Sequence, residues 1–156
     1  MKVTKTRLTG AVIGVVLAFV GVWEGLRTEA YVDLVGVPTI CYGETKGVKL
    51  GDKKTKDQCS YMLLESLKRH EAGMRTCLNK PDEIPIKSYI SFVSLTYNIG
   101  TGAFCRSTAV KRLNRGDLAG ACQAATWYNR AGGRRVKGLV NRRAAEYELC
   151  MEGVKG

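Results

Sequence analysis

The sequence predicts a single α+β domain that is mainly α-helical and carries one small antiparallel β-sheet in its N-terminal part. The chain has 156 residues, which is enough to bury a core as one domain or as one domain in two lobes. After residue 56, apolar residues recur mostly at helical spacing. From Ala30 to Leu50 the chain instead contains short β-favouring runs separated by glycines and a proline, which is typical of a small sheet.

The first predicted element is a helix formed by the uncharged run from Leu8 to Trp23, which follows Lys2, Lys5 and Arg7. Basic residues before an apolar stretch favour a cytoplasmic N-terminus and are typical of export. As a helix the run extends about 24 Å, against about 30 Å of bilayer hydrocarbon, so it would be a weak permanent anchor. A cleaved signal peptide is the alternative, but no good small-x-small cleavage site ends the run.

Two β-favouring runs, Tyr31–Val37 and Thr39–Tyr42, predict the antiparallel sheet. Thr55 with Gln58 three residues later is the pattern of a capping box at a helix start. The apolar spacing beyond it predicts a helix over residues 56–77, on which the single histidine, His70, is expected to be structural. Further helices are predicted over residues 86–99, 107–115, 118–127 and 137–151, the first of them apolar all round and therefore buried.

Six cysteines are many for this length, and none of them forms a C-x-x-C pair. Together with the single histidine this argues against a zinc site, and no metal or cofactor is predicted. An even cysteine count without metal spacing indicates three disulfides and an oxidising compartment. Reduced core cysteines in a cytosolic protein are the alternative.

The chain is strongly basic, with 25 Lys and Arg against 14 Asp and Glu and a formal charge of +11. Such proteins bind anionic partners, which include nucleic acid, membrane surfaces and acidic cell walls. No recognition helix, zinc knuckle or base-stacking strand is evident, so nucleic acid is not the predicted partner. A surface that only confers solubility is the alternative.

Glu24, Asp33 and Thr39 lie in a turn-rich stretch just beyond the apolar run. Gly25 and Gly36 favour a helix end followed by a hairpin, which would bring the two carboxylates to opposite lips of one cleft. Glycoside hydrolysis needs such a pair, with one carboxyl protonated to donate to the leaving oxygen and the other ionised. On spacing alone, a solvated surface cluster is the simpler interpretation.

The sequence of this stretch, EGLRTEAYVDLVGVPT, resembles the active-site motif of the T-even-phage-type lysozymes, glycoside hydrolase family 24. Two later strings, SLTYNIGTGAFCRST and WYNRAGGRRVKGLVNRRAAEYELC, resemble that family as well, so the resemblance covers about residues 20–151. It implies a lysozyme-like two-lobed fold, with the small sheet in the N-terminal lobe and a helical C-terminal lobe. The N-terminal run resembles that of the signal-anchor-release endolysins of lambdoid phages.

The resemblance implies a muramidase that hydrolyses the β-1,4 bond between N-acetylmuramic acid and N-acetylglucosamine in peptidoglycan. Glu24 would be the general acid, Asp33 its ionised partner, and Thr39 would position the attacking water. Asn98 would contact the substrate, with a helix cap as its alternative role. Glu44 stands where these lysozymes often carry histidine near the catalytic pair, and we assign it to the substrate site. There it would raise the pKa of a neighbouring carboxyl, with a side chain that points into solvent as the alternative.

For the second half of the chain, the resemblance implies that Arg142 and Arg143 stabilise the helix below the site, with an exposed surface pair as the alternative. It also implies three disulfides, Cys41–Cys59, Cys77–Cys105 and Cys122–Cys150.

Residues 1–23 would form a signal-anchor-release segment and residues 24–156 the catalytic domain. The protein, expected to be a monomer, would first sit in the host inner membrane with its N-terminus inside and its catalytic domain in the periplasm. It would then become soluble in the periplasm, with the segment serving as the first helix of the enzyme. No cysteine precedes Cys41, so release by disulfide exchange is not expected.

Two rival functions follow from the same features. A lytic transglycosylase also uses an acidic residue but does not need the water-activating pair of Asp33 and Thr39. A non-enzymatic, basic, membrane-active lysis protein would act through its N-terminal segment alone.

Overall fold

The computed structural model describes residues 5–156, and these residues divide into two compact units. One unit is Leu8–Lys68, and the other is Arg69–Gly156 together with the described residues before Leu8. Lys2, part of the predicted basic N-terminus, lies outside the described residues.

The Leu8–Lys68 unit begins with helix α1, Ala11–Glu24, so the predicted N-terminal helix is confirmed with a start three residues later than the apolar run. Gly25 ends α1 because it adopts a positive φ of 69° that a larger side chain disfavours, and its N–H donates to the Gly21 carbonyl at 3.2 Å. Among residues 5–156, no helix combines the length and apolar character that crossing a bilayer requires.

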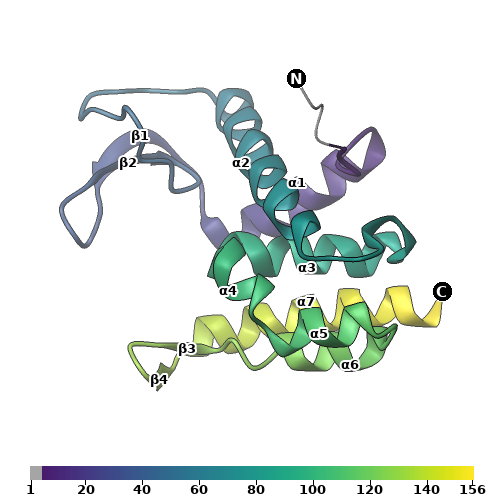
Figure 1. Ribbon diagram of the computed structural model, residues 1–156. Helices are drawn as coiled ribbons and strands as arrows, with labels where there is room; N and C mark the ends of the chain where they lie inside the picture. Colours follow the sequence, from purple (N-terminus) through teal and green to yellow (C-terminus); the bar gives the residue numbers. More distant parts are fainter. Residues whose placement is uncertain (1–4) are drawn as a thin grey trace. The chain divides into compact units, whose positions relative to one another are not determined.

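Strands β1 (Arg27–Val32) and β2 (Pro38–Cys41) form the predicted antiparallel sheet, with Tyr31 opposite Thr39 (Figure 1). The predicted extent of the first strand is wrong, because β1 ends at Val32 and Asp33–Val37 form the turn. The Asp33 side chain accepts backbone hydrogen bonds within this turn and so competes with strand pairing. This local competition outweighs the β propensity of the valines there.

Helix α2, Lys56–Thr76, starts with the predicted capping box, and the boundary between the two units falls within this helix. The Thr55 N–H donates to Gln58 Oε1 at 2.8 Å, and the Gln58 N–H donates to Thr55 Oγ1 at 3.1 Å. The Cys41–Cys59 disulfide joins the end of β2 to the first turn of α2. The predicted capping box and the predicted Cys41–Cys59 disulfide are therefore both confirmed.

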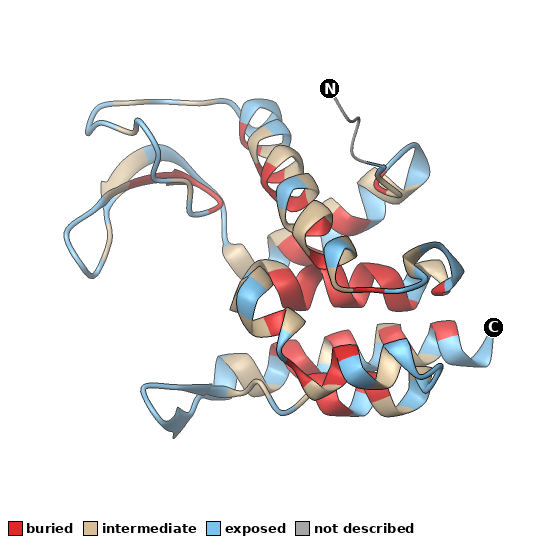
Figure 2. Ribbon diagram, in the orientation of Figure 1, coloured by how far each residue is buried: buried red, intermediate tan, exposed pale blue. Residues whose placement is uncertain are grey.

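The second unit is helical around α3, Ile86–Ile99, which packs mainly against α7, Lys137–Lys155 (Figure 1). Figure 2 shows α3 buried along most of its length, as its all-round apolar pattern predicts. The remaining predicted helices are α5 and α6, and four short elements were not predicted. The bounds are α5 Thr108–Asn114, α6 Leu118–Ala125, the 3-10 helix η1 Pro81–Glu83, α4 Thr101–Cys105, β3 Arg130–Ala131 and β4 Arg134–Arg135.

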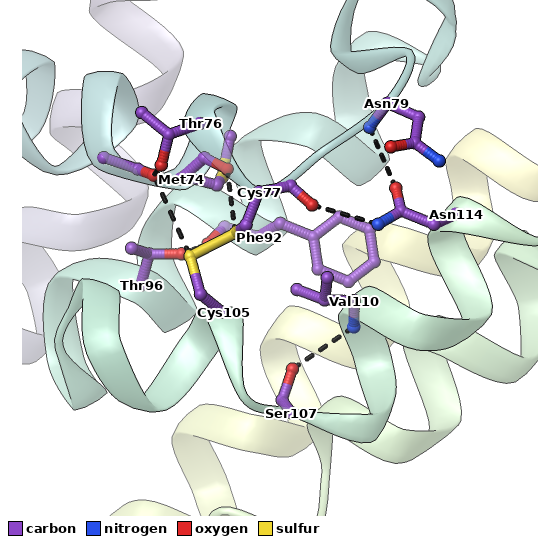
Figure 3. Close-up of a disulfide and its surroundings, with 11 residues drawn as sticks. Met74, Thr76, Cys77, Asn79, Phe92, Thr96, Cys105, Ser107, Val110 and Asn114 are labelled. Carbon is purple, nitrogen blue, oxygen red and sulfur yellow. Dashed lines mark hydrogen bonds between the residues drawn. A yellow bond between two sulfur atoms is a disulfide. The ribbon is translucent and has the colours of Figure 1, made fainter.

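Two disulfides, Cys77–Cys105 and Cys122–Cys150, lie in this unit, so all three predicted pairings are confirmed. Figure 3 shows the first of them together with Asn114, whose side-chain amide binds the backbone at two points of the loop between α2 and η1. Asn114 Nδ2 donates to the Cys77 carbonyl and its Oδ1 accepts from the Asn79 N–H, both at 2.9 Å. The predicted fold class, mainly helical with a small antiparallel sheet, is confirmed.

Candidate active site

Glu24, the predicted proton donor, is the last residue of α1 and is half-buried. One turn earlier, Gly21 lies against the ring of Tyr42, the residue that follows β2. A Cβ at Gly21 would be 3.4 Å from Tyr42 Cε1. Residues three apart share one face of a helix, so Glu24 lies on the face of α1 that the end of the hairpin contacts.

Asp33 is fixed by the turn that it begins. Its Oδ1 accepts from the Val35 N–H at 3.0 Å and from the Val37 N–H at 2.8 Å, and its own N–H donates to the Val37 carbonyl at 3.0 Å. Hydrogen bonds from backbone amides to a carboxylate are strong and directional. Because both amides bind Oδ1, the orientation of the carboxylate is set and Oδ2 is left to meet another group.

Thr39 is the second residue of β2 and is 3% exposed. Its hydroxyl donates to the Val37 carbonyl at 2.9 Å. With its proton used in this way, Oγ1 has lone pairs that can accept a hydrogen bond from water. The backbone of the turn therefore orients both Asp33 and Thr39.

Glu44 belongs to the same unit as Glu24, Asp33 and Thr39. It is half-buried, and its backbone pairs with Ile40 through two hydrogen bonds of 2.9 Å. This bridge returns the chain towards β2, and it fixes the backbone at Glu44. Its predicted role at the substrate site stays a prediction.

Asn98 lies in the other unit, near the end of α3, and is exposed. Its Oδ1 accepts from Arg143 Nη1 at 2.9 Å. Because the amide oxygen faces the guanidinium, the Nδ2 group points away from it and is presented as a hydrogen-bond donor.

Arg142 and Arg143 are 4% and 2% exposed, so the alternative of a surface pair is wrong. Both pair with Glu146, which also accepts from the Ser94 hydroxyl at 2.6 Å. Burial raises the pKa of the Glu146 carboxyl, against the opposing effect of Arg143. The network joins α7 to α3 below Asn98, which agrees with the predicted role of the arginines in stabilising a helix.

Within residues 5–156, no group of three or more His, Cys, Asp or Glu side chains is arranged to hold a metal ion. The groups on the turn of the Leu8–Lys68 unit are a carboxylate, a hydroxyl and backbone amides. Such a set serves proton transfer and the activation of water.

Residues 21–146 match the phage lysozyme family. The chain belongs to this family. It is 40% identical over 149 residues to the SAR-endolysin of Pseudomonas phage phiKMV, covering 93% of this chain and 91% of that relative. It is 37% identical over 131 residues to the SAR-endolysin of Enterobacteria phage P21, covering 83% of this chain and 78% of that relative.

Among solved structures, this chain resembles the endolysin from Escherichia coli O157:H7 phage FAHEc1, with a TM-score of 0.81 and 33% identity over 95% of this chain and 96% of that one. Family membership and this fold make the protein an endolysin and a glycoside hydrolase of the muramidase type. Its substrate is peptidoglycan, whose β-1,4 bond between N-acetylmuramic acid and N-acetylglucosamine it hydrolyses.

Sequence reasoning missed the contact between Gly21 and Tyr42, which relates Glu24 to the hairpin. A glycine three residues before an acidic residue at a helix end is the only local signal for it. It also missed Glu71, a fully buried carboxylate on α2 that accepts a hydrogen bond from the Arg7 N–H. No spacing pattern marks that residue.

Proposed function

We propose that Glu24 donates a proton to the leaving oxygen of the glycosidic bond while Asp33 and Thr39 hold the attacking water. The supporting observation is the turn between β1 and β2, which fixes one oxygen of Asp33 and the proton of Thr39 through backbone groups. Asp33 Oδ2 and Thr39 Oγ1 are then the acceptors for one water molecule. Preorganised groups of this kind need no rearrangement as charge develops on the sugar.

The same proposal implies inversion at the anomeric carbon, as the resemblance to the T-even-phage-type lysozymes indicates. Inverting glycosidases keep their two carboxyls about 6.5–9.5 Å apart so that a water fits between one of them and the sugar. Proton NMR of the first products reports the anomer that forms before mutarotation. An inverted anomer supports a direct attack by water, and a retained one contradicts it.

Asn98 and Glu44 are proposed to contact the glycan, Asn98 through the amide donor that Arg143 holds outward. The formal charge of +11 would keep the enzyme on the acidic wall by a non-specific attraction.

We further propose that residues 1–23 act as a signal-anchor-release segment ahead of a catalytic domain of residues 24–156. The protein, a monomer, would insert into the host inner membrane with its N-terminus inside and later become soluble in the periplasm. Two features support this: the weak apolar run after basic residues, and the use of the same residues as helix α1 of the folded enzyme. Glu24 ends that helix, so an inserted segment leaves the proton donor without its support.

The decisive experiment is digestion of peptidoglycan by purified wild type, Glu24→Gln and Asp33→Asn. We expect both variants to keep the wild-type melting temperature and to lose activity by about 10²-fold or more, the lower bound for a positioned acid or base. New reducing ends identify hydrolysis, whereas anhydro-muramyl ends would identify a lytic transglycosylase. Lysis by a folded Glu24→Gln variant would favour the non-enzymatic lysis protein and contradict the proposal.

A further inference from the structure

The described residues before Leu8 belong to the same unit as Arg69–Gly156. Within that unit they contact a set of side chains that the lysozyme reaction does not use. The set is Glu71 and Arg75 on α2, Asp82 in η1, and Tyr89 on α3. We refer to these four residues as the docking site, and to Lys5, Thr6 and Arg7 as the N-terminal arm.

Glu71 is the centre of the docking site and is 1% exposed. Its Oε1 accepts from the Thr6 hydroxyl, and its Oε2 accepts from the Arg7 N–H at 2.9 Å and from the Tyr89 hydroxyl at 2.6 Å. A buried carboxylate is costly unless both oxygens are hydrogen-bonded. Without the arm, Glu71 would keep only the bond from Tyr89 among these three.

Arg7 makes a second group of contacts with the same unit. Its Nη1 donates to the Pro81 carbonyl at 3.0 Å and to the Ile84 carbonyl at 2.6 Å. Its guanidinium lies 4.5 Å from the centre of the Tyr89 ring, within the range of a cation–π contact. Only a planar, multi-donor cation can serve two carbonyls and a ring face together.

Lys5 completes the arrangement at the surface. Its Nζ lies 2.6 Å from Asp82 Oδ2, while Arg75 Nη2 lies 2.9 Å from Asp82 Oδ1. Arg75 also donates to the Tyr89 hydroxyl at 3.0 Å, so the exposed and buried parts of the docking site form one connected network. All three residues of the arm thus have a partner of matching chemistry.

We propose that the docking site specifically binds the chain's own N-terminal arm, and that this binding keeps the released enzyme away from the membrane. The second half of this inference rests on the proposed membrane state. With the N-terminus inside, Lys5 and Arg7 lie on the cytoplasmic side of the bilayer and Glu71 on the periplasmic side, so they cannot meet. Contacts made in only one of two states shift the equilibrium towards that state.

The test compares Arg7→Lys and Glu71→Gln with wild type and with Arg27→Lys as the matched control. Arg7→Lys keeps the positive charge that sets orientation in the membrane, and Glu71→Gln leaves the arm itself unchanged. Arg27 is an exposed arginine on β1 that stacks on Tyr31, so Arg27→Lys repeats the chemical change outside the docking site.

The first readout is trypsin cleavage of the bond after residue 7 in purified full-length protein, followed by mass spectrometry. We expect this bond to be cut about tenfold faster or more in Arg7→Lys and Glu71→Gln, since each loses hydrogen bonds to or from a charged group. Arg27→Lys should match wild type, and all variants should hydrolyse isolated peptidoglycan at the wild-type rate. Equal cleavage in all four proteins overturns the docking site. If Glu71→Gln does not fold, Arg7→Lys alone decides.

The second readout is the share of enzyme in the membrane pellet before lysis. We expect a larger share and later lysis for the two docking-site variants than for wild type and Arg27→Lys. Faster trypsin cleavage with an unchanged share overturns the holding role. Faster cleavage with wild type never found in the membrane supports the docking site and contradicts the proposed membrane control.

Discussion

At the scale of single residues, the turn after β1 orients the proposed catalytic groups with backbone atoms alone. Asp33 and Thr39 both bind groups within Asp33–Val37, so their geometry depends on five consecutive residues. Asn98 is different, because its orientation depends on a buried arginine from a helix far along the chain.

The orientation of Asn98 leads to the first prediction, for the isosteric change Asn98→Asp. A carboxylate would still accept from Arg143 but offers no N–H to the substrate. We expect kcat/KM to fall about tenfold, as for the loss of one good hydrogen bond, with no loss in the free energy of unfolding. Asn79→Asp, the same change at an exposed site, serves as control. Wild-type activity in Asn98→Asp would make Asn98 a structural helix-end residue only.

At the scale of elements, the face of α1 that carries Glu24 is set by the contact of Gly21 with Tyr42. We predict that Gly21→Gln lowers kcat in purified enzyme, because a longer side chain displaces the ring and with it the hairpin relative to Glu24. Gly14 has open space where a Cβ would lie, with no atom within 4 Å, so Gly14→Gln should be nearly wild type. Equal kcat values for the two variants, measured on peptidoglycan, would contradict this role of the contact.

The packing of α7 on α3 depends on Gly153 in a similar way. A Cβ there would lie 2.9 Å from the Ser88 backbone N and even closer to its Oγ, which donates to the Cys150 carbonyl at 2.7 Å. We expect Gly153→Ala to lower the free energy of unfolding by about 1–3 kcal/mol, the usual cost of overpacking.

Gly138→Ala, on the same helix with open space around it, should instead stabilise by up to about 1 kcal/mol through helix propensity. Urea denaturation of both variants tests the pair of expectations. A Gly153→Ala protein as stable as Gly138→Ala would contradict the close approach of the two helices.

These elements also show how far sequence patterns reach. The capping box at Thr55 and the periodic helices could be predicted because their signals lie within a few residues. The end of β1 could not be predicted, because the Asp33 side chain accepts from the Val37 backbone N–H and so competes with strand pairing. Helix α4, with five residues, is too short to show a periodic pattern.

The same distinction between local signals and tertiary packing applies to the residues of the candidate site. The resemblance to the T-even-phage-type lysozymes indicated Glu24, Asp33 and Thr39 directly. The partners that orient side chains from a distance, such as Tyr42 beside Gly21 or Arg143 beside Asn98, follow only from tertiary packing.

At the scale of the whole molecule, we expect the contact of the N-terminal arm with Asp82 to make the stability of the fold depend on pH. Hydrogen bonds from Lys5 and Arg75 hold the pKa of Asp82 below its ordinary value of 3.8. A depressed carboxyl pKa contributes stability above the unfolded value and loses it as pH falls through the folded value. We therefore expect Asp82→Asn to be less stable than wild type at neutral pH and to lose less stability on acidification below about pH 4.

Thermal melts of both proteins over this range measure the effect. Parallel curves of melting temperature against pH would show that the contacts of Asp82 with the arm contribute nothing to stability.

Our central proposal is that the residues of α1 serve as the membrane anchor and also as the support of Glu24, so that the inserted enzyme is inactive. Its most direct test is the hydrolysis of soluble glycan strands by spheroplasts, which expose the periplasmic face of the membrane-held enzyme. We predict no cleavage above the Glu24→Gln background while the enzyme is membrane-held, and the full rate of purified enzyme per molecule after release. Equal rates per molecule before and after release would contradict the account.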